Sequence, residues 1–126
     1  MKTIYAGAFL TENLSGSLEN VIENQHITFI PPGSNKKLSE QLLGGYYDFK
    51  IIGYANDGQN EGALIELPEE LKQFYHNENP PHITVSLAKG AKAVNTGKLN
   101  FELFPVPFNV KVQFGEFTNQ GIIFEK

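Results

Sequence analysis

The sequence predicts a mixed α+β fold in which most of the sheet is antiparallel. Segments typical of strands and of helices are interspersed without the regular spacing of βαβ units, and several strands are joined by turns too short for a parallel crossover. The length of 126 residues fits one domain, residues 1–126, around a single core. Two of the predicted strands carry the same His-Ile-Thr tripeptide. We therefore expect two similar lobes around a central groove, where ligand sites commonly form.

The N-terminal part is predicted to contain two strands with a short helix between them. Residues 2–10 are predicted as the first strand, and residues 15–24 as the helix. The apolar stripe of this helix consists of Leu18, Val21 and Ile22. Residues 26–30 are predicted as the second strand. The segment 31–35, Pro-Pro-Gly-Ser-Asn, ends it because neither proline can donate to a sheet and because Gly and Asn favour a turn.

The middle of the chain is predicted to hold a hairpin between two short helices. Residues 38–43 are predicted as a helix that ends at a Gly-Gly pair. Residues 46–55 and 62–67 are predicted as strands joined through the turn-rich segment 56–60. The segment 68–70, Pro-Glu-Glu, begins the second helix, because proline and acidic residues are favoured in a first turn. The apolar stripe of this helix consists of Leu71, Phe74 and Tyr75.

The C-terminal part is predicted to consist mostly of strands. Residues 82–87 are predicted as a strand, and residues 88–98 as a loop or an irregular helix. Residues 101–126 are predicted to contain two or three strands rich in Phe and Val. The breaks between these strands are expected at Pro105, at Pro107 and at the turn Asn119-Gln120-Gly121.

The repeated tripeptide predicts an active site with two histidines. Side chains at positions i and i+2 of a strand share one face, so His26 with Thr28, and His82 with Thr84, each present an imidazole and a hydroxyl together. Two such strands lying close together would bring two imidazoles and two hydroxyls into one cleft. The residues expected behind them in the core are Ile27, Phe29, Ile83 and Val85.

The charge pattern argues against long nucleic acids as partners. Ten lysines and no arginine stand against fourteen acidic residues, which gives a net charge of −4. A protein that holds duplex DNA normally carries a basic face, because neutralising many phosphates dominates that affinity. A small nucleotide or oligonucleotide needs only one or two nearby cations. Lys36 and Lys89, which follow the two tripeptides, are candidates for this role, and Tyr5 is a candidate for stacking on a base.

The lack of cysteine excludes a disulfide framework, a thiolate nucleophile and zinc sites built on cysteine. Neither a cofactor nor a metal is expected, because no His-Glu-x-x-His or comparable ligand spacing occurs. The segment 57–61 resembles part of a calcium loop, but it lacks the full ligand set and is better explained as a turn. The apolar run near the N-terminus is too short for a signal peptide or a membrane span, so we expect a cytoplasmic protein without a membrane partner.

The segments His26-Ile27-Thr28-Phe29 and His82-Ile83-Thr84-Val85 resemble the paired motifs of the two-histidine (2H) phosphoesterase superfamily. The resemblance implies a bilobal sheet structure whose histidines face each other across a groove and act on cyclic or internucleotide phosphodiesters without metal. The segment 81–87, followed by Lys89, Gly90 and Lys92, is most similar to the second motif of small members, some of them viral. One implied role is therefore viral degradation of a host nucleotide signal. Since arginine is absent, any family role of a phosphate-binding arginine has no counterpart here.

Two opposed imidazoles suit the cleavage of a phosphodiester. One takes a proton from the attacking water or hydroxyl, and the other gives one to the departing oxygen, near neutral pH. Thr28 and Thr84 are expected to donate hydrogen bonds to the phosphate oxygens. The expected substrates are a cyclic nucleotide, a cyclic oligonucleotide or an RNA end with a 2',3'-cyclic phosphate. The sequence does not assign base and acid. A module that binds a nucleotide in the same groove without turnover, and a purely structural domain, are the alternatives.

Overall fold

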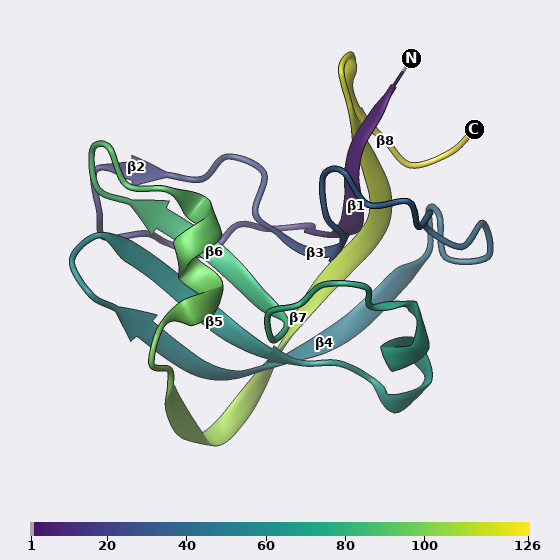
Figure 1. Ribbon diagram of the computed structural model, residues 1–126. Coiled ribbons are helices and arrows are strands. Elements are labelled where there is room, and N and C mark those ends of the chain that lie inside the picture. The colour runs from purple at the N-terminus through teal and green to yellow at the C-terminus, as the bar shows by residue number, and fades with distance from the viewer. Residues whose placement is uncertain (1) are drawn as a thin grey trace.

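The computed structural model describes residues 2–126 as one curled antiparallel sheet with two short 3₁₀ helices (Figure 1). The strands are β1 (Thr3–Leu10), β2 (Asn20–Val21), β3 (His26–Ile30), β4 (Tyr46–Asn56), β5 (Asn60–Glu66), β6 (His82–Leu87), β7 (Glu102–Thr118) and β8 (Gly121–Ile123). The helices are η1 (Glu69–Phe74) and η2 (Ala93–Lys98). The strand order is β2-β6-β5-β4-β7-β1-β3, and β8 pairs with β7. The predicted predominance of antiparallel pairing is confirmed.

The longest strand, β7, joins two parts of the sheet. One part holds β1 and β3, and the other holds β2, β4, β5 and β6. Strand β7 pairs with β1 through Val112–Thr118 and with β4 through Glu102–Gln113, and Figure 1 shows it running from the lower edge of the view to the hairpin with β8. The predicted breaks at Pro105 and Pro107 are wrong. Ile51 of β4 pairs with Phe108 and Gly53 with Leu103, so the prolines lie in a stretch without β4 partners. A missing N–H costs no sheet hydrogen bond there, and the strand continues.

The two strands with His-Ile-Thr, β3 and β6, occupy the predicted residues. Both begin with the same alternation of half-buried and buried positions. The core residues predicted behind the motifs are confirmed, because Ile27, Phe29, Ile83 and Val85 are at most 2% exposed. Although β3 and β6 are far apart in the strand order, the curl of the sheet brings them into contact.

Two of the predicted helices are wrong. Residues 15–24 instead pass over β6, where the Leu18 N–H donates to the Ser86 hydroxyl at 3.1 Å and β2 adds a two-residue strand. This tertiary pairing replaces the internal hydrogen bonds of a helix. Residues 38–43 form two successive turns, in which the Leu42 N–H donates to the Ser39 carbonyl and the Gly45 N–H to the Leu42 carbonyl.

The helix predicted after Pro68 is corrected in type, and the loop or irregular helix predicted at residues 88–98 is confirmed. The helix predicted after Pro68 is η1, a 3₁₀ helix whose Leu71 is buried in the core, and the irregular segment 88–98 contains η2. Both are six residues long, which is longer than most 3₁₀ helices. The turn predicted at 119–121 is confirmed. Within residues 2–126, no helix has the length and the apolar character that are needed to cross a membrane.

Candidate active site

The two motif histidines are held in the same way. The Nδ1–H of His26 donates to the Asn24 carbonyl at 2.7 Å, and the Nδ1–H of His82 donates to the Pro80 carbonyl at 2.7 Å. A carbonyl oxygen can only accept, so these contacts place the proton of each neutral imidazole on Nδ1. The Nε2 atom of each ring is therefore the basic nitrogen. The acceptor lies two residues before the histidine in both copies, so the strand entry itself sets the tautomer.

The environment lowers the pKa of both imidazoles from the usual value of 6.5. Burial is the main cause for His26 and for His82, and the hydrogen bond to the carbonyl offsets part of it. The charge of His82 lowers the pKa of His26 further. The two histidines lie on β3 and β6, two strands that contact each other. The structure thus brings together the two predicted histidines and favours their neutral forms at pH 7.

The motif threonines have uncommitted hydroxyls. Thr28 and Thr84 are half-buried, and by the alternation of the strands they share the faces of His26 and His82. Within residues 2–126, neither hydroxyl hydrogen-bonds to another protein group, and no side-chain polar atom is buried without a partner. The hydroxyls can therefore donate to a ligand without breaking an existing hydrogen bond.

The repeat extends to the strands that pair with the two motifs. In one part of the sheet, Gly7, Ala8 and Phe9 pair with Thr28, Ile27 and His26. In the other part, Gly62, Ala63 and Leu64 pair with Thr84, Ile83 and His82. The register of each strand pair shifts immediately before its glycine. This second repeat was not predicted, although Gly-Ala followed by a large apolar residue is visible in the sequence of both strands.

Each of these glycines allows a close approach of two strands. A Cβ atom on Gly7 would lie 2.1 Å from the carbonyl oxygen of Ile27. A Cβ atom on Gly62 would lie 3.0 Å from the carbonyl oxygen of Ile83 and 2.4 Å from a methyl carbon of Thr96. Any larger residue would push the motif strand away from its neighbour. The glycines therefore help to place the two histidines.

One backbone hydrogen bond and one buried side chain connect the segment before β3 to β6. The Ile22 N–H donates to the Val85 carbonyl at 3.0 Å. Gln25, which precedes the first motif and is fully buried, accepts from the Leu14 N–H at 2.7 Å and donates to the Leu14 carbonyl at 2.8 Å. Its Nε2 also lies 3.5 Å from the Val85 carbonyl. Gln25 thus ties the entry of β3 to the centre of β6, a contact that sequence alone does not reveal.

The loop between η1 and β6 makes a second connection to β3. The His76 N–H donates to the Phe29 carbonyl at 2.8 Å, and the Asn77 side chain donates to the Thr28 carbonyl at 3.1 Å. The His76 side chain is exposed. Because this loop leads into Pro80 and His82, it fixes the start of β6 against β3.

Glu61 stabilises residues 15–24, the segment that runs beside β6. Its buried carboxylate accepts hydrogen bonds from the Ser17 N–H at 2.9 Å, the Ser17 hydroxyl at 3.0 Å, the Ser86 hydroxyl at 2.6 Å and the Tyr54 hydroxyl. Burial raises the pKa of Glu61, but these hydrogen bonds outweigh it and hold the pKa below the usual value. Glu61 remains charged at neutral pH and anchors the chain beside Gly62.

The three residues predicted to bind substrate have different surroundings. Tyr5 stacks on His26 at 4.7 Å between ring centroids and on Phe117 at 4.9 Å, and burial raises its pKa to about 12. Lys36 lines a cleft of about 700 Å³ together with Tyr5. Lys89 is exposed in the turn after β6 and is outside that cleft. The structure therefore brings Tyr5 and Lys36 together near His26.

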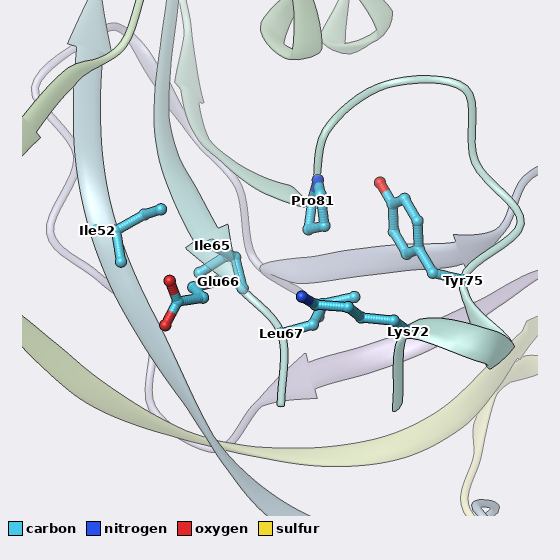
Figure 2. Close-up of a pocket in the computed structure, with 7 residues that line it drawn as sticks. All are labelled: Ile52, Ile65, Glu66, Leu67, Lys72, Tyr75 and Pro81. Atoms are coloured by element: carbon cyan, nitrogen blue, oxygen red, sulfur yellow. The ribbon is translucent and has the colours of Figure 1, made fainter. Parts of the chain in front are cut away.

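A separate apolar pocket of about 310 Å³ lies at the end of β5. Figure 2 shows Ile52 on one side of it and Pro81 and Tyr75 on the other. The Tyr75 hydroxyl donates to the Asn79 carbonyl at 2.7 Å, which leaves mainly apolar atoms in the wall. The pocket reaches Pro81 but contains none of the four motif side chains, so it is not part of the candidate site.

In the part of the chain that the structure describes, residues 2–126, no three His, Cys, Asp or Glu side chains are grouped so that they could hold a metal ion. The candidate site consists of a pair of imidazoles with two nearby hydroxyls and one lysine-lined cleft. Comparison with known proteins finds no family model and no curated protein that matches this chain.

Proposed function

We propose that the protein is a metal-independent phosphodiesterase of the 2H type. Its substrate would be a cyclic nucleotide, a cyclic oligonucleotide or an RNA end with a 2',3'-cyclic phosphate. The observation that carries the proposal is the matched pair of imidazoles, each with the proton fixed on Nδ1 and the basic Nε2 left for chemistry. Under this proposal, the two parts of the sheet with the Gly-Ala and His-Ile-Thr repeats are the two lobes of the groove.

The different surroundings of the two histidines favour one assignment of the general acid and the general base. His26 stacks on Tyr5 and lies beside Phe9, and these apolar rings disfavour its charged form, so His82 is the better carrier of the single proton that the pair needs. His26 Nε2 would take a proton from the attacking water as its oxygen bonds to phosphorus. His82 would give its proton to the departing oxygen as the other P–O bond breaks. The Thr28 and Thr84 hydroxyls would stabilise charge on the non-bridging oxygens.

The test is a screen for turnover in the presence of excess chelator. Cyclic mono-, di- and trinucleotides and RNA with a 2',3'-cyclic end would be incubated with the protein in EDTA, and the products separated by chromatography. We expect one of these substrates to be cleaved, with EDTA leaving the rate unchanged. The double variant His26→Ala/His82→Ala serves as the blank, and loss of activity in EDTA would disprove the metal-independent mechanism.

Two other results would replace this function. Tight binding of a nucleotide without product over many hours would favour the binding module that sequesters its ligand. Neither binding nor cleavage of any compound in the screen would favour a structural domain. Equal cleavage by the double variant would show that the histidines are not the catalytic pair.

A further inference from the structure

The cleft that contains Tyr5 and Lys36 lies beside Tyr5, whose ring stacks on His26. It lies between the start of β1, the segment 30–38 after β3 and the C-terminal residues, near the two ends of the chain that Figure 1 marks N and C. Its volume of about 700 Å³ is within the range of about 300–1,000 Å³ that is usual for small-molecule sites. The apolar part of its wall consists of Ile4, Ile30, Pro31, Pro32 and Leu38.

The cleft is positively charged in a protein whose net charge is −4. Four of the ten lysines line it, namely Lys2, Lys36, Lys37 and Lys126. The acidic residue in its wall, Glu116, is bound by Lys126 at 3.2 Å and by the Thr3 hydroxyl at 2.9 Å. Within residues 2–126, no carboxylate forms an ion pair with any of the other three lysines. Three ammonium groups are therefore available for an anionic ligand.

One aromatic ring lies between the cleft and the candidate active site. Tyr5 lines the cleft, and its ring stacks on the His26 imidazole. A pKa of about 12 keeps the Tyr5 phenol neutral, so it adds no negative charge to the cleft. A ligand bound among the lysines would therefore lie beside the Tyr5 ring, which contacts His26.

We propose that this cleft binds the phosphate of the nucleotide adjacent to the scissile linkage, with Lys36 and Lys37 as its main contacts. This inference rests on the proposed phosphodiesterase function. Lysine ammonium groups are common phosphate ligands, and the prolines and isoleucines of the wall offer apolar surface to a ribose or a base. The substrate then carries at least two phosphates and is a short oligonucleotide.

The kinetic test compares substrates that differ in their number of phosphates. They are a 2',3'-cyclic mononucleotide, a dinucleotide with a 2',3'-cyclic end and a cyclic dinucleotide. For the variant Lys36→Glu/Lys37→Glu, we expect kcat/KM to fall at least tenfold more on the preferred two-phosphate substrate than on the mononucleotide. Most of the loss should appear in KM, because the contact is present in both the ground state and the transition state. The two dinucleotides distinguish a linear from a cyclic ligand.

The matched control is Lys98→Glu/Lys111→Glu, which makes the same change of charge at two exposed lysines outside the cleft. It should keep kcat/KM within twofold of wild type on every substrate. Equal losses on the mononucleotide and the two-phosphate substrates, or equal losses in the two charge variants, would overturn the proposal.

A binding measurement decides the matter even if no turnover is found. Fluorescently labelled dinucleotide, linear or cyclic, would be titrated into the His26→Ala/His82→Ala protein with and without the Lys36→Glu/Lys37→Glu change. We expect the charge reversal to raise Kd at least tenfold, and an unchanged Kd would refute the cleft as a phosphate site. Failure of the catalytic function would instead appear as wild-type and double-histidine proteins with the same activity.

Discussion

The part of the sheet that carries His26 and the part that carries His82 have the same backbone plan with different surroundings. Both pair Gly-Ala-apolar with His-Ile-Thr, and both bond Nδ1 to the carbonyl two residues earlier. His26, however, stacks on Tyr5 and lies 5.3 Å from the ring of Phe9. Leu64 takes the position of Phe9 opposite His82.

Under the proposed function, this difference would let one backbone plan produce two chemical roles. The shared features fix the tautomer and the direction of each ring, which both an acid and a base require. The unshared features affect the protonation: His26 lies among aromatic rings, whose apolar surface disfavours the charged imidazole. Pairs of titratable groups whose environments separate their pKa values are typical of acid–base catalysis.

The largest expected effect is loss of the imidazoles. His26→Ala and His82→Ala should each lower kcat by roughly 10²–10⁴-fold, because each removes a proton-transfer group. The double variant should lose much less than the product of the two effects, because the histidines act as a unit. Steady-state kinetics on the substrate from the screen would measure this. His76→Ala, at an exposed histidine, is the matched control and should retain wild-type kcat.

The second prediction compares the two glycines. Gly7→Ala should lower the free energy of unfolding by about 3 kcal/mol, because its Cβ would overlap backbone that cannot rotate away. Gly62→Ala should cost less, about 1–3 kcal/mol, because its nearest obstacle is the Thr96 methyl. Thr96→Ser removes that methyl and keeps the hydroxyl that accepts from Asn60 at 3.0 Å.

The loss of stability caused by Gly62→Ala should therefore be smaller in the Thr96→Ser background than in the wild-type background. Chemical denaturation of the four proteins measures this. If Gly7→Ala is as stable as wild type, the strand approach in the first part of the sheet is looser than the structure shows.

A third prediction separates acid from base. A substrate with a nitrophenolate leaving group needs little protonation of the departing oxygen, so the general acid matters less for it. On this substrate the loss caused by His82→Ala should shrink at least tenfold, whereas the loss caused by His26→Ala should stay the same. Steady-state rates on the natural and the nitrophenyl substrates give the comparison. The opposite pattern would exchange the two roles.

The smallest expected effect is on stability as a function of pH. Both imidazoles have a folded pKa below the usual 6.5, so the unfolded chain binds protons more readily than the folded protein. Stability is therefore unaffected above pH 6.5 and falls as the pH drops below it, by at most about 1.4 kcal/mol per pH unit for each histidine.

Denaturation midpoints between pH 7 and pH 5 would measure this slope. It should be smaller in His26→Ala and in His82→Ala than in wild type, because each variant removes one of the two groups whose pKa is lowered on folding. A slope that is the same in all three proteins would show that other groups are responsible.

The sequence predicted those parts of the site that depend on local pattern. Alternation gave the bounds of β3 and β6 and the burial of Ile27 and Ile83, because one face of each strand must enter the core. It did not predict the path of residues 15–24, which depends on the distant Ser86 and Glu61. Their helical periodicity was outweighed by tertiary hydrogen bonds.

The contacts that align the two motif strands depend on distant partners in the same way. Gln25 resembles any polar residue before a strand until Leu14 and Val85 are placed around it. The cleft near His26 combines residues from both ends of the chain, so no sequence window contains it. Only the Gly-Ala repeat was available to sequence reasoning and was missed.

The pairing of β1 with β7 has a consequence for how the protein folds. Thr3 pairs with Thr118, so the first strand is completed by nearly the last one. Contacts between such distant residues must close a large loop before they contribute stability, which slows folding. During synthesis on the ribosome, β1 cannot pair with β7 until β7 has been synthesised. A nascent chain that already contains both histidines still lacks the strand that joins the two parts of the sheet.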